Sequence, residues 1–239
     1  MNITTILLDL DGTLLPMDQN EFTNKYFKLL CKKMSNYGYD PKELTEAIWK
    51  GTYAMIKNNS SESNEIIFWN CFAGIFGERV MNDKKYFDEF YRNEFNNLRS
   101  SCGYNPEAAK IVRKFKSMGL RVILATNPIF PAEATESRIE WTGLEPDDFE
   151  FYTTYENISG CKPNLRYYRN IMDRFALSPR ECIMVGNDVT EDMAAKELGM
   201  NVFLVTDCLI NKNNEDINKF PRGNLEQMGT YILSDKTII

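Results

Sequence analysis

Two aspartates end the first apolar run of the sequence, in "ILLDLDGTLLPMD" over residues 6–18. Asp9 and Asp11 are two positions apart, and because successive strand residues alternate faces, their side chains point the same way. The Asp-Gly pair that follows is also a common turn signal, so a strand that simply stops at a turn is the simpler interpretation. The alternative is that the two carboxylates act together on one substrate.

Polar side chains that could bind or transfer a group also follow the other predicted strands. They are Thr126 and Asn127 at the end of the strand predicted over 120–126, Lys162 after 149–154, and Asn187, Asp188 and Asp192 after 181–186. Ligands of open α/β sheets bind beyond the carboxyl ends of the strands, so these groups would converge on one crevice. Singly, each has a simpler role: Asp188 could cap the helix that follows it, and a lone lysine is usually solvated. Their joint position favours a functional site.

Apolar runs predict the sheet that must position these groups. Short, continuously apolar runs such as 4–10 are typical of strands buried on both faces, as in a parallel sheet. From about residue 102 such runs alternate with helical patterns, which indicates a doubly wound α/β fold. We therefore expect a Rossmann-like α/β core made of residues 1–15 and 100–239.

Residues 16–99 differ in character and are expected to form an inserted, all-α domain. The segment 21–34 has apolar residues at helical spacing, and 40–56 begins with Asp40 as N-cap and Pro41 at the first helical position. Two more helical patterns follow. The block is rich in aromatic residues, which we expect to form the core between these helices.

The bulk composition argues against several classes of protein. With a net charge of −6 and no basic cluster, nucleic acid is not an expected partner. No apolar run approaches the ~18 residues of a membrane span. The first residues lack the basic start of a signal peptide, so we expect a cytoplasmic protein without membrane association. Its six scattered cysteines, without a CxxC pair, are expected to be free thiols.

The sequence contains no histidine. This excludes Ser-His-Asp and Cys-His catalysis and a phosphohistidine intermediate. A zinc site is not expected either, because spaced cysteines are missing as well. General acid–base chemistry must therefore fall to Asp, Glu, Lys, Tyr or Cys side chains.

The segments "DLDGTLL", "LATN", "CKP" and "VGNDVTED" resemble, in this order, the four motifs of the haloacid dehalogenase (HAD) superfamily. The resemblance covers the whole chain, and residues 16–99 are similar to the C1-type helical cap of that superfamily. Asp11 makes the chain resemble the phosphatase branch, because haloacid dehalogenases lack this second aspartate. Response-regulator receivers also use Asp, Thr and Lys, but they lack the DxDGT motif and a cap.

This resemblance implies a Mg²⁺-dependent phosphatase that hydrolyses a small phosphorylated metabolite through an aspartyl-phosphate. Asp9 would be the nucleophile, and Asp11 would protonate the leaving oxygen and later activate water. Thr126 and the backbone amide of Asn127 would hold phosphate oxygens, and Lys162 would neutralise the nucleophile and the transferring group.

The family pattern also implies the metal ligands. Mg²⁺ prefers hard oxygen ligands, here Asp9, the Asp11 carbonyl and Asp188, with Asp192 nearby. Many relatives carry Gly-Asp where this chain has Gly186-Asn187-Asp188, so Asn187 is the alternative to Asp188.

Two other functions fit the same motifs. One is a phosphotransferase such as a sugar-phosphate mutase, and the other is a non-catalytic regulatory protein that binds a phosphorylated ligand. Pro128 follows Thr126-Asn127 where many phosphoglycolate phosphatase-like relatives have a basic residue, so phosphoglycolate is not the expected substrate. The protein is expected to be a monomer or a weak dimer.

Overall fold

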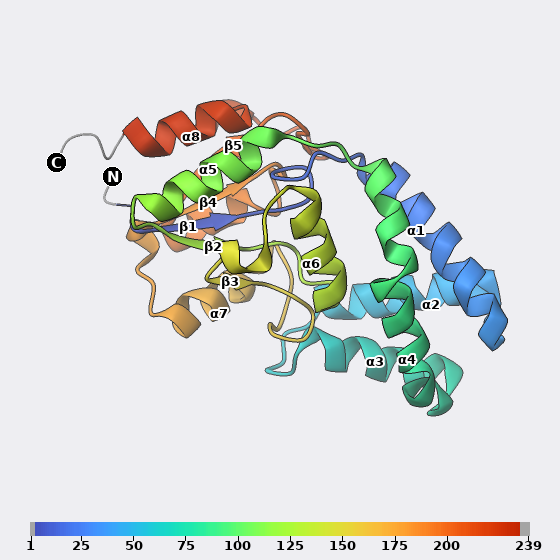
Figure 1. The fold of residues 1–239 in the computed structure, drawn as a ribbon. Helices are drawn as coiled ribbons and strands as arrows, with labels where there is room; N and C mark the ends of the chain where they lie inside the picture. Colours follow the sequence, from blue (N-terminus) through green and yellow to red (C-terminus); the bar gives the residue numbers. More distant parts are fainter. Residues whose placement is uncertain (1–2, 235–239) are drawn as a thin grey trace.

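A six-stranded sheet with the order β3-β2-β1-β4-β5-β6 forms the centre of the molecule, in a computed structural model that describes residues 3–234 (Figure 1). The strands are β1 (Thr5–Leu8), β2 (Arg121–Leu124), β3 (Phe151–Tyr152), β4 (Cys182–Gly186), β5 (Asn201–Val205) and β6 (Arg222–Gly223). Every neighbouring pair is parallel, which confirms the predicted Rossmann-like α/β fold. The carboxyl ends of all these strands therefore lie along one edge of the sheet.

Helices cover both faces of this sheet. Figure 1 shows α5 (Pro106–Ser117) and α8 (Leu225–Ser234) on one face and α7 (Leu165–Phe175) on the other. In β1, Ile6 and Leu8 belong to the hydrophobic cluster that includes α5 and α8, whereas Leu7 belongs to the cluster that includes α7. This alternation confirms a strand that is buried on both faces.

Four further helices lie together at one side of the sheet, to the right in Figure 1. They are α1 (Gln19–Met34), α2 (Pro41–Ile56), α3 (Asn64–Phe76) and α4 (Arg79–Arg92), and α6 (Ala132–Trp141) packs against α4. Asp40 caps α2 by accepting hydrogen bonds from the backbone of Lys42 and Glu43, as the sequence predicts. The division of the chain into domains near residues 16 and 99 stays a prediction.

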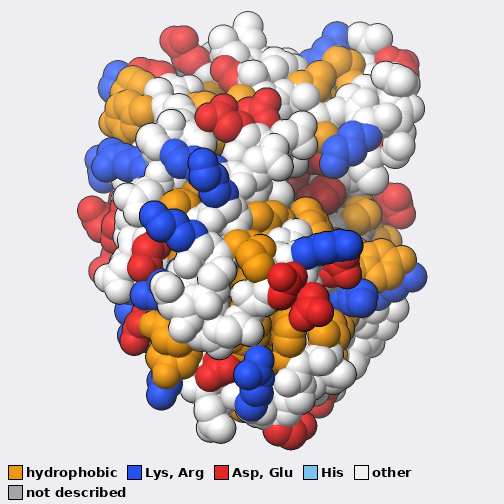
Figure 2. Space-filling view, turned by 90° about the vertical axis from the view of Figure 1, so that its right-hand side faces the viewer, with side chains coloured by type: hydrophobic (Ala, Val, Ile, Leu, Met, Phe, Trp, Pro, Cys, Tyr) orange, Lys and Arg blue, Asp and Glu red, His pale blue; other side chains and the backbone are white. Residues whose placement is uncertain are grey.

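Most aromatic residues of these helices are at least partly buried, as expected, but Trp49 and Tyr53 are exposed. Phe72, Phe87 and Phe90 are almost fully buried, whereas Trp49 is 51% exposed. Figure 2 views the end of the molecule formed by α1–α4, where acidic, basic and hydrophobic side chains are interspersed. The aromatic residues of these helices therefore form a hydrophobic core only in part.

The segment after β4 differs from its prediction. The sequence pattern predicts a helix directly after Asp188, but the chain forms a turn followed by a short 3-10 helix, Met193–Leu198. The side chain of Asp192 turns inward and accepts a hydrogen bond from the backbone of Asp188. That contact and the hydrogen bond from Lys162 to Asp192 stabilise a turn where the first helical residues were expected.

The described part of the chain has no helix that is both long and apolar enough to cross a membrane. None of the six cysteines forms a disulfide, as predicted.

Candidate active site

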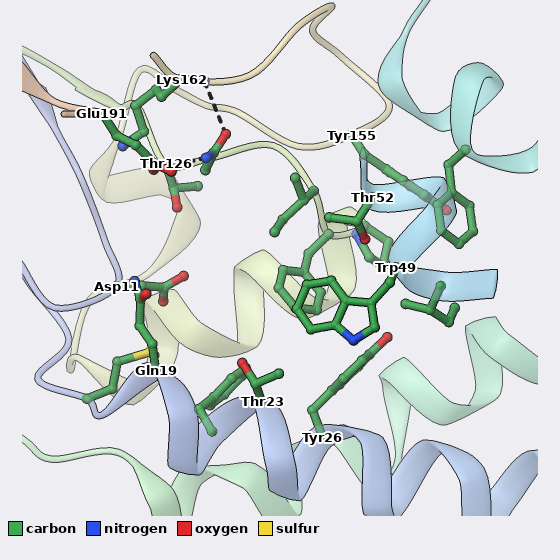
Figure 3. Close-up of a pocket in the computed structure, with 18 of the residues that line it drawn as sticks. Asp11, Gln19, Thr23, Tyr26, Trp49, Thr52, Thr126, Tyr155, Lys162 and Glu191 are labelled. Atoms are coloured by element: carbon green, nitrogen blue, oxygen red, sulfur yellow. Dashed lines mark hydrogen bonds between the residues drawn. The ribbon is translucent and has the colours of Figure 1, made fainter. Parts of the chain in front are cut away.

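A cavity of about 250 Å³ lies between the carboxyl ends of the strands and helices α1–α4. It is lined by all the side chains that the sequence analysis placed in a site: Asp9, Asp11, Thr126, Asn127, Lys162, Asn187, Asp188 and Asp192. Figure 3 shows Asp11, Thr126, Lys162 and Glu191 on one side of this cavity. The parallel sheet therefore brings the predicted residues together.

The Asp9 carboxylate is held on both of its oxygens. The backbone of Asp9 continues the sheet by donating to Val185 O at 2.9 Å, which fixes the position of the side chain. Its Oδ1 accepts from Lys162 Nζ at 2.7 Å, and its Oδ2 accepts from Thr13 Oγ1 at 2.9 Å. Asp9 is 5% exposed, so this oriented carboxylate reaches solvent only through the cavity.

The chain turns sharply after Asp9, and Gly12 permits the turn. Leu10 O accepts hydrogen bonds from the backbone of both Leu14 and Leu15, and Gly12 has a φ of +86°, which is costly for other residues. A Cβ atom at Gly12 would also lie 2.3 Å from Asn187 Nδ2. The DxDG segment is thus packed directly against the end of β4.

Lys162 is the buried cation of the site. Its ammonium bridges Asp9 Oδ1 and Asp192 Oδ1, each at 2.7 Å, and its side chain is 1% exposed. Burial would lower the pKa of Lys162, but the adjoining Asp192 and Asp9 carboxylates raise it well above its ordinary value. Lys162 is therefore a permanent positive charge beside Asp9.

Asp11 is paired with an arginine that the sequence analysis missed. Arg138 of α6 is 1% exposed and donates from Nη1 to Asp11 Oδ2. Burial raises the pKa of Asp11, an effect opposed by Arg138 and reinforced by Asp9. Within residues 3–234, Asp11 Oδ1 is buried and has no hydrogen-bond partner. An arginine on the apolar face of a helix, beside Ala134 and Ile139, is the sequence signal that could have revealed this contact.

Hydroxyl groups from neighbouring segments hold the loop after β2. Thr126 O accepts from Thr153 Oγ1 at 2.6 Å and from Tyr167 OH at 2.9 Å. Asn127 Oδ1 accepts from the backbone of Lys162 at 3.2 Å, and Asn127 Nδ2 donates to Glu191 at 3.0 Å. The predicted phosphate-binding residues Thr126 and Asn127 are thus tied to the loop that carries Lys162.

Glu191 is a second acid that the sequence analysis did not place in the site. It lines the cavity, and burial raises the pKa of its carboxyl to about 7, against the attraction of Lys162. Its position directly before Asp192 could have drawn attention to it. Sequence alone does not show which side of a turn faces inward.

Helix α3 begins with a buried asparagine that links this side of the cavity to the helical block. Asn64 Nδ2 donates to Pro128 O and to Gly160 O, each at 3.0 Å, and its Oδ1 accepts from Gly160 N at 2.9 Å. Pro128 and Gly160 belong to the loops that carry Asn127 and Lys162. Asn64 therefore holds both loops against α3.

The three polar side chains after β4, one amide and two carboxylates, have different surroundings. Asn187 is buried and donates from Nδ2 to Cys208 O, and its Oδ1 lies 3.1 Å from the Thr13 hydroxyl that Asp9 shares, so its amide is committed to the protein. Asp188 is half-buried, and its Oδ1 caps the following turn by accepting from Thr190 N and Glu191 N. Both oxygens of Asp192 are hydrogen-bonded, to Lys162 and to the backbone of Asp188.

The donor atoms of the site suit a hard cation. Asp9, Asp11 and Asp188 line one cavity, Asp11 Oδ1 has no partner among the described residues, and no imidazole is available in this sequence. Such an oxygen-only set fits Mg²⁺, which keeps several water ligands, better than zinc. No group of three or more acidic or cysteine side chains within residues 3–234 is arranged as a metal site.

The sequence matches a family model described as haloacid dehalogenase-like hydrolase over residues 6–205. No curated protein sequence gives a significant match.

Solved structures that are similar to this chain share its fold at low sequence identity. One is a HAD phosphatase from Thermococcus onnurineus, with 16% identity, a TM-score of 0.59 and 96% of this chain and 98% of that chain covered. Another is a predicted phosphoglycolate phosphatase from Haemophilus somnus 129pt, with 16% identity, a TM-score of 0.59 and coverage of 97% and 99%. A third is the L-2-haloacid dehalogenase from Xanthobacter autotrophicus, with 12% identity, a TM-score of 0.56 and coverage of 97% and 98%.

Proposed function

This chain belongs to the haloacid dehalogenase-like hydrolase family, and within it we propose a phosphatase that hydrolyses a small phosphorylated metabolite. The observation that carries this proposal is the Asp9 carboxylate, held by Lys162 and Thr13 in the cavity that Asp11 also lines. Expulsion of an alkoxide from a phosphate ester needs a proton donor, and a halide does not. The presence of Asp11 therefore supports phosphate esters over haloacids.

In the first step, a carboxylate oxygen of Asp9 attacks phosphorus and forms an aspartyl-phosphate. The bond from phosphorus to the ester oxygen breaks, and Asp11 transfers its proton to that oxygen to release an alcohol. Burial of Asp11, which raises its pKa, favours the protonated form that this step uses. Lys162 stays beside Asp9 and offsets the negative charge of the phosphoryl group.

In the second step, water attacks the phosphorus atom of the aspartyl-phosphate. Asp11, now ionised, accepts a proton from this water, and the bond between phosphorus and the Asp9 oxygen breaks. Inorganic phosphate leaves, and both aspartates return to their starting states. Thr126 and the backbone amide of Asn127 would hold phosphoryl oxygens in line for both steps.

We also propose Mg²⁺ as the cofactor, with Asp9, the Asp11 main-chain carbonyl and Asp188 as its protein ligands. When bound, the cation would stabilise the charge on the phosphoryl oxygens. The committed amide of Asn187 favours Asp188 over Asn187 as the ligand. Asp192 holds Lys162 and the turn after β4 through its two carboxylate oxygens, so we assign it to positioning these groups.

The test is phosphate release from 4-nitrophenyl phosphate and from a panel of sugar, nucleotide and short-acid phosphates. It is run with Mg²⁺, with a chelator, and with the Asp9→Asn variant. We expect Mg²⁺-dependent release that Asp9→Asn abolishes. Asp173→Asn, an exposed acid in α7, is the matched control and should retain full activity. No release from folded protein on any ester, or full activity of Asp9→Asn, would overturn the proposal.

A further inference from the structure

The cavity has two chemically different ends. Figure 3 shows Asp11, Thr126, Lys162 and Glu191 on one side and Tyr26, Trp49 and Tyr155 on the other. The first side holds the reacting phosphate in the proposed function. The second side is therefore where the alcohol part of the ester would lie, and its chemistry selects the substrate.

We call the second side of the cavity its wall. The lining residues that α1–α4 contribute to this wall carry no charged side chain. Among the described residues that line the cavity, Lys162 is the single basic side chain, and it is already committed to Asp9 and Asp192. The lining residues from α1–α4 are aromatic, aliphatic or neutral polar side chains. A second anionic group on the substrate would find no cation there and would lie in a cavity that five acidic residues line. Burying such an unpaired charge is unfavourable.

Four aromatic side chains on this side of the cavity are linked in pairs by hydrogen bonds. Tyr26 OH and Tyr91 OH share a hydrogen bond of 2.8 Å, and Trp69 Nε1 donates to Tyr155 OH at 3.3 Å. All four of these side chains line the cavity, so their rings offer apolar surface to a ligand.

Trp49 provides the accessible ring surface. Its indole packs against Phe27 with ring centroids 5.4 Å apart, and Trp49 both lines the cavity and is 51% exposed. Large aromatic side chains are normally buried, so an open indole at a cavity is a natural place for a ligand ring to stack.

Neutral hydrogen-bonding groups are spread along the cavity: in Figure 3, Gln19 lies near Asp11, Thr52 near Trp49, and Thr23 between them. The side chains of Gln19, Thr23 and Thr52 line the cavity, and no partner for them exists among the residues that the structure describes. They could bind an uncharged hydroxyl, carbonyl or ring nitrogen of a ligand.

We infer that the substrate is the phosphate monoester of an uncharged alcohol that carries an aromatic ring, and that Trp49 binds this ring. This inference rests on the proposed function and names its substrate class. Phosphorylated short acids and bisphosphorylated sugars are excluded, because their second anionic group would face the neutral wall.

The experiment compares kcat/KM for 2-phenylethyl phosphate, glycerol 3-phosphate and phosphoglycolate, all esters of alkyl alcohols. We expect 2-phenylethyl phosphate to exceed each of the others by at least about tenfold, as for other apolar pocket contacts. Trp49→Ala should remove most of this preference by raising KM for 2-phenylethyl phosphate alone. Tyr53→Ala, an exposed aromatic one turn further along α2 that does not line the cavity, should leave the ranking unchanged. A preference for phosphoglycolate would overturn the inference. So would a ranking of the three esters that is the same in the wild type and in Trp49→Ala.

A binding measurement separates this inference from the proposed function. Calorimetry with 2-phenylethylphosphonate and phosphonoacetate needs no turnover, because neither compound has a phosphate ester bond to break. Tighter binding of the aromatic phosphonate that Trp49→Ala weakens would support the aromatic site even if no ester were hydrolysed. If esters are hydrolysed but phosphonoacetate binds as tightly or more tightly, the phosphatase proposal stands and the substrate class is wrong. If neither phosphonate binds, the inference also fails.

Discussion

Arg138 and Asp11 are 127 residues apart in the chain, yet the guanidinium of one donates to the carboxylate of the other inside the fold. Arg138 also donates to Ala134 O and to Thr135 Oγ1, and its guanidinium lies 4.7 Å from the ring of Phe130. These contacts hold Arg138 rigidly. Helix α6 therefore sets the orientation of the carboxylate that we assign to proton transfer.

Loss of Arg138 should affect both stability and proton transfer. Arg138→Met leaves the partly buried Asp11, whose side chain is 22% exposed, without its counter-charge, so we expect a loss of up to about 3 kcal/mol in unfolding free energy. The pKa of Asp11 should rise further, which would move the pH profile of phosphate release to higher pH. Denaturant unfolding and a pH–rate profile measure these two effects.

The double variant Arg138→Met/Asp11→Asn is the control for this pair. Removing the charge of Asp11 should recover part of the stability lost by Arg138→Met, because the two residues are in contact. If the losses of unfolding free energy in the two single variants add up to the loss in the double variant, Arg138 and Asp11 do not interact.

Lys162→Met should abolish turnover and destabilise the fold. The change leaves Asp9 and Asp192 close together without the ammonium that bridges them, and removing one partner of a buried ion pair costs about 3–5 kcal/mol. We expect kcat to fall by at least about 10²-fold, because electrostatic stabilisation of the transferring group is lost. Lys110→Met, which removes an exposed lysine from an i,i+3 pair, should change neither quantity measurably. Wild-type kcat in Lys162→Met would exclude the role assigned to this lysine.

Glu191 should make stability depend on pH. Its pKa is about 7 in the folded protein, against 4.5 for an ordinary glutamate, so the folded state favours the protonated form. The stability that this provides is complete below about pH 4.5 and is lost as pH rises to about 7. A displacement of this size corresponds to roughly 3 kcal/mol as an upper value.

The measurement for Glu191 is unfolding free energy between pH 4.5 and pH 8 in a chelator, for wild type and Glu191→Gln. We expect the wild type to lose stability relative to Glu191→Gln as pH rises over this range. Parallel pH curves for the two proteins would show that Glu191 does not titrate there.

Gly12→Ala should be more damaging than the same change at another glycine of similar conformation. Gly12 and Gly119 have φ values of +86° and +76°, so alanine meets a similar backbone cost at both. At Gly12 the new methyl group would also meet Asn187 Nδ2 at 2.3 Å, whereas nothing lies within 4 Å at Gly119. We expect Gly12→Ala to cost about 1–3 kcal/mol more than Gly119→Ala in thermal or denaturant unfolding. Equal costs would show that Asn187 moves away freely.

The strands of the sheet and the polar groups at its edge are predictable from the sequence. Continuous apolar runs such as that of β1 can be buried only between two layers of helices, and a parallel sheet sends every strand end to the same edge. Local sequence patterns therefore suffice to assign Asp9, Thr126, Lys162 and Asp188 to one crevice. The helical character of α1 and α2, with Asp40 as the N-cap of α2, followed equally from local pattern.

The tertiary structure alone decided which side chains surround that crevice. Arg138, Glu191 and Trp49 are on segments whose local patterns allow several faces to turn inward, and the choice depends on packing between elements distant in sequence. The same holds for the turn after β4, where the contacts of Asp192 with Lys162 and Asp188 prevail over local helical preference. Helical periodicity fixes which residues share a face, but only the assembled core determines what that face meets.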